Sequence, residues 1–129
     1  MRILRCSLDP AEAAATLREH LPEHEIVLGP PEEIPSLVSE ADVIVPARFR
    51  LDATLLQRAK RCRLIQQMGA GVDMVDLSAA ESLGMPVANA PGDQTGGADS
   101  IAEMALWLVI ACRRRFPPNK RHRVCGSEY

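Results

Sequence analysis

A chain of 129 residues with 47% hydrophobic and 25% charged side chains is typical of a soluble globular protein with one domain. The formal charge of −2 combines an acidic body with a basic end, residues 113–129, which carry six basic groups and one acid. An acidic body argues against nucleic acid as the main partner. The N-terminal stretch lacks the apolar core of a signal peptide, and the four scattered cysteines are typical of reduced thiols, so we expect a cytoplasmic protein.

Short apolar strands alternate with helices along the chain. The predicted strands cover residues 2–6, 25–28, 42–45, 63–67 and 86–89. The predicted helices between them cover residues 9–20, 31–40, 51–61 and 76–84. Asp9 and Asp76 are the expected N-caps of the first and the last of these helices, and Gly84 is the expected end of the last. This alternation predicts an α/β fold, a parallel sheet with helices on both faces.

Ligands of such sheets bind at the carboxyl ends of the strands. The fourth strand ends at Gly69-Ala70-Gly71, but position 74 is Met74, so the dinucleotide fingerprint G-x-G-x-x-G fails. Successive backbone N–H groups of this loop could form a nest for a small anion such as a carboxylate. A plain glycine turn without a ligand is the other interpretation, and the loop alone does not decide between them. Arg48, beyond the third strand, either faces the same cleft or is solvated.

No metal site is predicted. His20 and His24 are four residues apart, but Pro22 breaks the helical geometry that would bring them together. Cys62 lies between two arginines, which could favour a thiolate, although a partly buried, inert thiol is the preferred interpretation.

The last predicted helix covers residues 100–115. Ser100 and Glu103 have the spacing of a capping box and are expected to start it. The following IAEMALWLVIAC is apolar almost all round, yet too short to span a membrane, and no membrane contact is expected. Residues 116–129 are expected to form a flexible basic tail.

Three linked motifs carry a resemblance. LIQQMGAGVDMVDLSAAESLGMPVANAPG, followed by DSIAEMALWLVIACRR, resembles the N-terminal substrate domain of the D-isomer-specific 2-hydroxyacid dehydrogenases. The resemblance implies a flavodoxin-like, doubly wound, five-stranded parallel sheet over residues 1–115. It also implies that the backbone amides of Ala70 and Gly71 bind the carboxylate of a small 2-hydroxy or 2-oxo acid. Gln94 and Thr95 stand where the family has an Asn-[Ser/Thr] pair, which implies a substrate contact for Gln94 and a cofactor contact for Thr95.

The family's NAD- or NADP-binding domain supplies a G-x-G-x-x-G loop and the catalytic arginine, acid and histidine, and this sequence shows none of these. We therefore expect a fragment that ends before that domain, has no catalytic residue of its own, binds no cofactor tightly and is inactive alone. The alternative is a non-catalytic module that self-associates through the 100–115 helix. A receiver-type signalling domain is discounted, because no acid follows the third strand and only Asp9 lies near the first.

Overall fold

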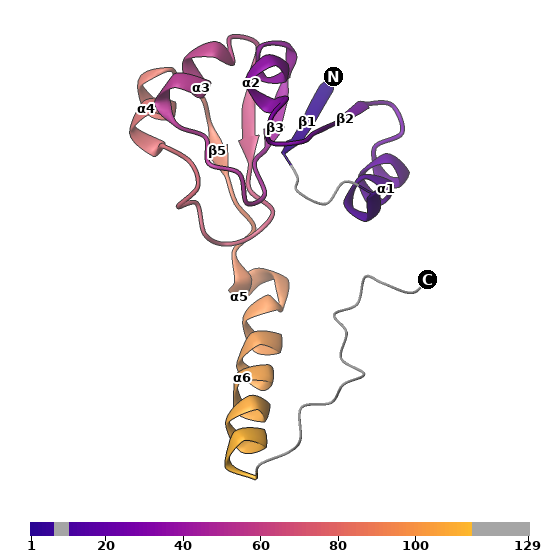
Figure 1. Ribbon diagram of the computed structural model, residues 1–129, viewed down its shortest axis with the longest axis vertical. Helices are drawn as coiled ribbons and strands as arrows, with labels where there is room; N and C mark the ends of the chain where they lie inside the picture. Colours follow the sequence, from indigo (N-terminus) through magenta and orange to yellow (C-terminus); the bar gives the residue numbers. More distant parts are fainter. Residues whose placement is uncertain (7–10, 115–129) are drawn as a thin grey trace. The chain divides into compact units, whose positions relative to one another are not determined.

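The computed structural model describes residues 1–6 and 11–114, which fall into two units, one up to residue 92 and one from residue 93 onward. The first unit is a five-stranded parallel sheet with strand order β2-β1-β3-β4-β5 (Figure 1). The strands are β1 (Arg2–Cys6), β2 (Glu25–Gly29), β3 (Val43–Val45), β4 (Leu64–Gln66) and β5 (Val87–Ala88). The helices of this unit are α1 (Ala11–His20), α2 (Ile34–Leu37), the 3-10 turn η1 (Val38–Glu40), α3 (Ala53–Arg58) and α4 (Leu77–Ser82).

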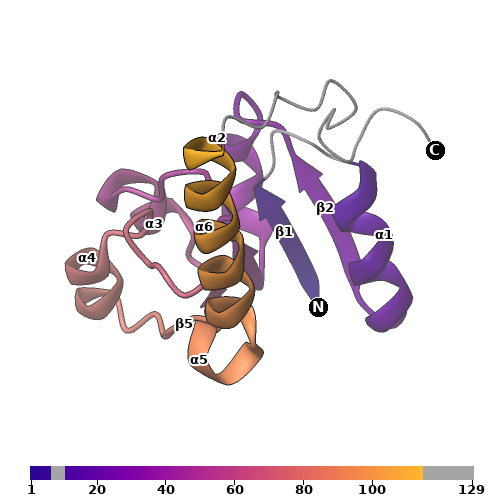
Figure 2. The ribbon, with the colours of Figure 1, turned by 90° about the horizontal axis from the view of Figure 1, so that it is seen from below.

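Each face of the sheet is buried by different helices (Figure 2). Successive side chains of a strand point to opposite faces, so the two faces collect alternate residues. Leu4 and Ile44 lie on the face covered by α2, η1, α3 and α4. Ile3 and Val43 lie in a second cluster, against which Leu17 of α1 packs. Helices on both faces and the doubly wound strand order confirm the predicted fold class.

The five predicted strands are confirmed to within one or two residues at each end. Asp76 accepts a hydrogen bond from the Ala79 N–H (3.0 Å) and caps α4, and Gly84 follows the helix with a φ of 65°. Both features were expected from the sequence. The predicted cap at Asp9 and the predicted tail lie outside the described residues.

Two helices follow the sheet: the short α5 (Gly92–Thr95) and the long α6 (Gly97–Arg113). The second unit begins at Asp93, so it includes all of α5 except Gly92. The prediction that Ser100 and Glu103 form a capping box at the start of α6 is wrong. Gly96, with a φ of 72°, is the N-cap instead, because glycine adopts this left-handed conformation without steric cost. Ser100 therefore lies inside the helix, and its hydroxyl donates to the Gly96 carbonyl (3.4 Å).

The apolar side chains of α6 are exposed. Trp107 and Ile110 keep 55% and 57% of their surface accessible, and α6 has no buried residue. Among residues 1–6 and 11–114, no helix is long and apolar enough to cross a membrane.

Candidate functional site

Three loops meet at the carboxyl ends of β3, β4 and β5. The loop after β3 pairs with the loop after β4 through a parallel bridge between Leu51 and Val75. The Leu51 N–H donates to the Met74 carbonyl (2.8 Å), and the Leu51 carbonyl accepts from the Asp76 N–H (3.0 Å). This bridge fixes the far ends of both loops beyond the strands themselves. The glycine loop, residues 69–71, lies between this bridge and the end of β4.

The segment after β5 holds the glycine loop by its carbonyl groups. The Ala90 N–H donates to the Gly69 carbonyl (3.1 Å), and the Asn89 side-chain amide donates to the Ala70 carbonyl (2.7 Å). The N–H groups of Ala70 and Gly71 have no hydrogen-bond partner within residues 1–6 and 11–114, and both residues are exposed. The carbonyls of Gly69 and Ala70 are therefore bonded, whereas the adjacent N–H donors of Ala70 and Gly71 are free among the described residues.

The glycines of the glycine loop do not adopt the left-handed backbone conformation. Neither Gly69 nor Gly71 has a positive φ, and a Cβ at Gly69 would contact nothing within 4 Å. The free donors of Ala70 and Gly71 thus lie in a bend without the left-handed residue of an αR–αL nest. No helix begins directly at the loop, since α4 starts only at Leu77. The loop does not fit the pyrophosphate of a dinucleotide, which binds where a glycine turn opens a helix.

The remaining predicted site residues belong to the second unit. Gln94 is exposed in α5, and Thr95 is the last residue of that helix. Their expected place beside substrate and cofactor stays a prediction, since Ala70 and Gly71 lie in the first unit. Arg48 is exposed in the loop after β3 and, within the described chain, makes no hydrogen bond or ion pair.

Sequence reasoning missed Gln67, which follows β4 directly. Its side chain is 7% exposed and contacts the loops after β3 and β4. The sequence signal was weak: two adjacent glutamines end the apolar run of this strand, and nothing in the sequence indicates that one of them is buried.

The thiols near the sheet are not activated. Burial raises the pKa of Cys6, at the end of β1, to about 12. Burial also raises the pKa of Cys62, so its two flanking arginines do not make it a thiolate. In the described parts of the chain, no three His, Cys, Asp or Glu side chains are grouped so that they could hold a metal ion.

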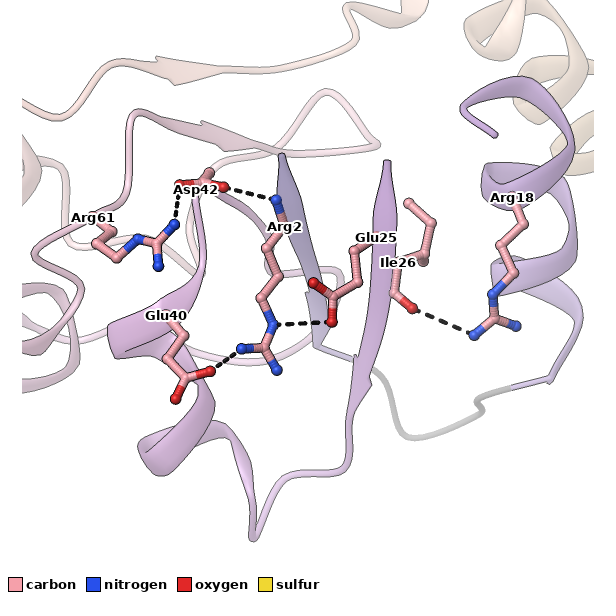
Figure 3. A network of polar contacts seen from close by, with 7 residues as sticks. All are labelled: Arg2, Arg18, Glu25, Ile26, Glu40, Asp42 and Arg61. Carbon is pink, nitrogen blue, oxygen red and sulfur yellow. Dashed lines mark hydrogen bonds and ion pairs between the residues drawn. The ribbon is translucent and has the colours of Figure 1, made fainter. Parts of the chain in front are cut away.

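A second polar cluster lies at the opposite, amino-terminal edge of the sheet (Figure 3). The Arg2 guanidinium pairs with Glu25 (Nε to Oε1, 3.5 Å) and with Glu40. Asp42 accepts from the Arg2 backbone N–H (2.7 Å) and from the Arg61 guanidinium (3.1 Å). These contacts join the starts of β1, β2 and β3 across the sheet, and exposed ion pairs of this kind contribute little stability each. The cluster has a structural role and lies away from the glycine loop.

The amino-acid sequence is similar to those of known 2-hydroxyacid dehydrogenases. Residues 3–116 match the family described as D-isomer specific 2-hydroxyacid dehydrogenase, catalytic domain. The D-3-phosphoglycerate dehydrogenase of Archaeoglobus fulgidus is 33% identical over 125 residues, which cover 94% of this chain and 23% of that protein. The glyoxylate reductase of Aeropyrum pernix is 37% identical over 87 residues, 67% of this chain and 25% of that protein.

A solved structure gives the same result. The NAD+-bound 3-phosphoglycerate dehydrogenase of Entamoeba histolytica superposes with a TM-score of 0.74 and 26% identity, covering 93% of this chain and 42% of that one. The chain thus spans about a quarter of the length of these curated relatives and less than half of this structural neighbour.

Proposed function

We propose that residues 1–115 form a substrate-binding domain for a small 2-hydroxy or 2-oxo acid. The chain belongs to the D-isomer-specific 2-hydroxyacid dehydrogenase family. The observation that carries this proposal is the pair of free N–H donors at Ala70 and Gly71, with the carbonyls of Gly69 and Ala70 already bonded. A carboxylate is the ligand that such a pair of donors favours, because charge-assisted hydrogen bonds are stronger than bonds to water.

The role of the loop is to hold and orient the substrate. A carboxylate at Ala70 and Gly71 would leave the neighbouring C2 carbon, the one that carries the hydroxyl, free to face a hydride acceptor. That acceptor would be NAD or NADP, with Gln94 near the substrate and Thr95 near the nicotinamide. The relative from Entamoeba histolytica binds NAD+. The 129 residues contain no G-x-G-x-x-G loop, so we propose that they do not transfer hydride alone.

The binding part of the proposal is tested by calorimetric titration of the 129-residue chain with glycolate, the smallest 2-hydroxy acid. We expect weak, saturable binding, and none for glycolamide, which has the same shape without the negative charge. Ala70→Pro removes one donor and should abolish binding, whereas Ala70→Gly keeps the donor and should retain it. Equal affinity for glycolate and glycolamide, or full binding by Ala70→Pro, would contradict a carboxylate site at this loop.

The catalytic part is tested by absorbance. The chain mixed with NAD or NADP and a panel of 2-hydroxy acids should produce no reduced nicotinamide. Turnover that is lost when a residue of this chain is changed would overturn the proposal that the chain is inactive alone.

A second candidate function rests on α6. The exposed side chains of Trp107 and Ile110, with those of Ile101, Met104 and Val109, form an apolar surface of the kind that marks protein interfaces. This supports a module that self-associates through the helix, with or without substrate. Burying one such side chain completely contributes roughly 1.5–3 kcal/mol, so several could stabilise a dimer against the entropy cost of association.

Sedimentation velocity separates the two candidates. Self-association predicts a dimer that becomes a monomer when Trp107 and Ile110 are both changed to Lys. A wild-type chain that stays monomeric at high concentration would refute the interaction module and leave the substrate domain untouched.

A further inference from the structure

Gln67 is the one buried polar side chain among the residues whose burial the structure describes. It lies between the end of β4 and the glycine loop. Both ends of its amide are bonded to backbone: Nε2 donates to the Ala47 carbonyl (3.3 Å), and Oε1 accepts from the Met68 N–H (3.2 Å). The bond to Ala47 thus joins the segment that leads into the glycine loop to the loop after β3, while the bond to the neighbouring Met68 fixes the orientation of the amide. The amide itself is buried, so loss of either bond would leave a buried polar group unpaired, which favours the arrangement in which both bonds are made.

The partner at Ala47 has an unusual backbone. Ala47 has a φ of 52° and is the one non-glycine residue in the described chain with a positive φ. A residue with a Cβ rarely adopts this left-handed conformation without a specific constraint from its surroundings. Two hydrogen bonds constrain it here: Gln67 binds the Ala47 carbonyl, and the Phe49 N–H closes a turn on the Pro46 carbonyl (2.8 Å). The conformation of the loop after β3 is therefore stabilised by a side chain that directly follows the next strand, β4.

We propose that Gln67 is a positioning residue, which sets the glycine loop and the loop after β3 at a fixed separation so that the Ala70 and Gly71 donors stay aligned for a carboxylate. The ligand in this statement rests on the proposed function, while the coupling of the two loops does not. The loops are joined at their far ends by the Leu51 bridge and at their near ends by Gln67. The Leu51 bridge joins the two loops through backbone groups, and Gln67 joins them through a side chain.

Three substitutions separate positioning from simple stability. Gln67→Met keeps the length and volume of the side chain but removes both hydrogen bonds. Gln67→Glu keeps the acceptor for Met68 and removes the donor to Ala47. Gln66→Met is the matched control, because Gln66 is only half-buried and its amide bonds to the carbonyl of its own neighbour, Gln67 (2.9 Å).

The measurement is a backbone amide NMR spectrum of each 129-residue variant, followed by titration with glycolate. We expect Gln67→Met to shift the resonances of residues 46–50 and 68–71 together and to weaken glycolate binding about tenfold, the effect of losing one or two hydrogen bonds. Gln67→Glu should shift residues 46–50 more than residues 68–71. Gln66→Met should change neither the two loops nor the affinity.

The inference is overturned if Gln67→Met leaves residues 46–50 unshifted, or if its glycolate affinity equals that of Gln66→Met. A fall in melting temperature without a change in these two quantities would likewise mean a purely structural glutamine. Absence of glycolate binding by the wild-type chain would instead contradict the proposed function, and the resonances of the two loops would still decide the coupling.

Discussion

Leu51 contributes its side chain to the core and its backbone to the bridge between the loops after β3 and β4. We therefore expect its truncation to alanine to destabilise the fold measurably. The side chain is fully buried in the cluster that α2, α3 and α4 form against the sheet, and its backbone bonds to Met74 and Asp76 hold both loops in place. Leu→Ala substitutions in cores cost about 2–5 kcal/mol, more where the surroundings cannot collapse into the cavity. The bonded loops resist such collapse, so we expect Leu51→Ala to lower the free energy of unfolding by about 3–4 kcal/mol.

The assay is urea denaturation followed by far-ultraviolet circular dichroism, which reports on the helices and strands of the first unit, whereas the single tryptophan, Trp107, belongs to the second unit. Leu83→Ala is the control: this leucine is 41% exposed, and its truncation should cost less than about 1 kcal/mol. Equal losses for the two variants, or a loss below about 1 kcal/mol for Leu51→Ala, would refute the claim that Leu51 packs in the core.

Three further predictions follow from the described contacts. The hydrogen bond from the Arg2 backbone N–H lowers the pKa of Asp42 below its ordinary value of 3.8. The stability that this carboxylate contributes should therefore be complete above the unfolded-state pKa and be lost as the pH falls through the lower folded-state pKa. Urea denaturation at a series of pH values should show that Asp42→Asn removes this part of the loss of stability in acid. Asp76→Ala should lower the unfolding free energy by about 1 kcal/mol through loss of the helix cap, whereas Asp76→Ser should restore most of it. The exposed Cys112 should react with a thiol reagent at once, whereas Cys6, buried with a pKa of about 12, should react only on unfolding; rapid modification of Cys6 in the native chain would contradict its burial.

The strands could be predicted because their signals are local. Runs of Val and Ile such as DVIV have no polar face, which fits a strand buried on both sides, and Asp76 and Gly84 have side-chain or backbone properties that favour helix ends. Strand order is not local: the alternation predicts only a parallel sheet with helices on both faces, and the doubly wound arrangement is what the resemblance implies. These parts of the fold agree with the structure.

The start of α6 could not be predicted, because two local signals compete there. Ser100 with Glu103 favours one start and Gly96 favours another, and the choice depends on backbone conformation rather than on residue type. Gln67 was missed for a different reason: its two partners are backbone groups, one of them twenty residues away, and backbone groups leave no mark in a sequence. The relation of Gln94 and Thr95 to the glycine loop stays a prediction.

The central claim is that the glycine loop binds a carboxylate through the N–H groups of Ala70 and Gly71. The most direct measurement is a residue-resolved amide NMR titration of the wild-type chain with glycolate. The account predicts that the largest downfield shifts of the amide protons occur at Ala70 and Gly71 and saturate together, with smaller changes at Asn89, whose side chain holds the Ala70 carbonyl. Saturable shifts centred elsewhere, with Ala70 and Gly71 unmoved, would contradict it.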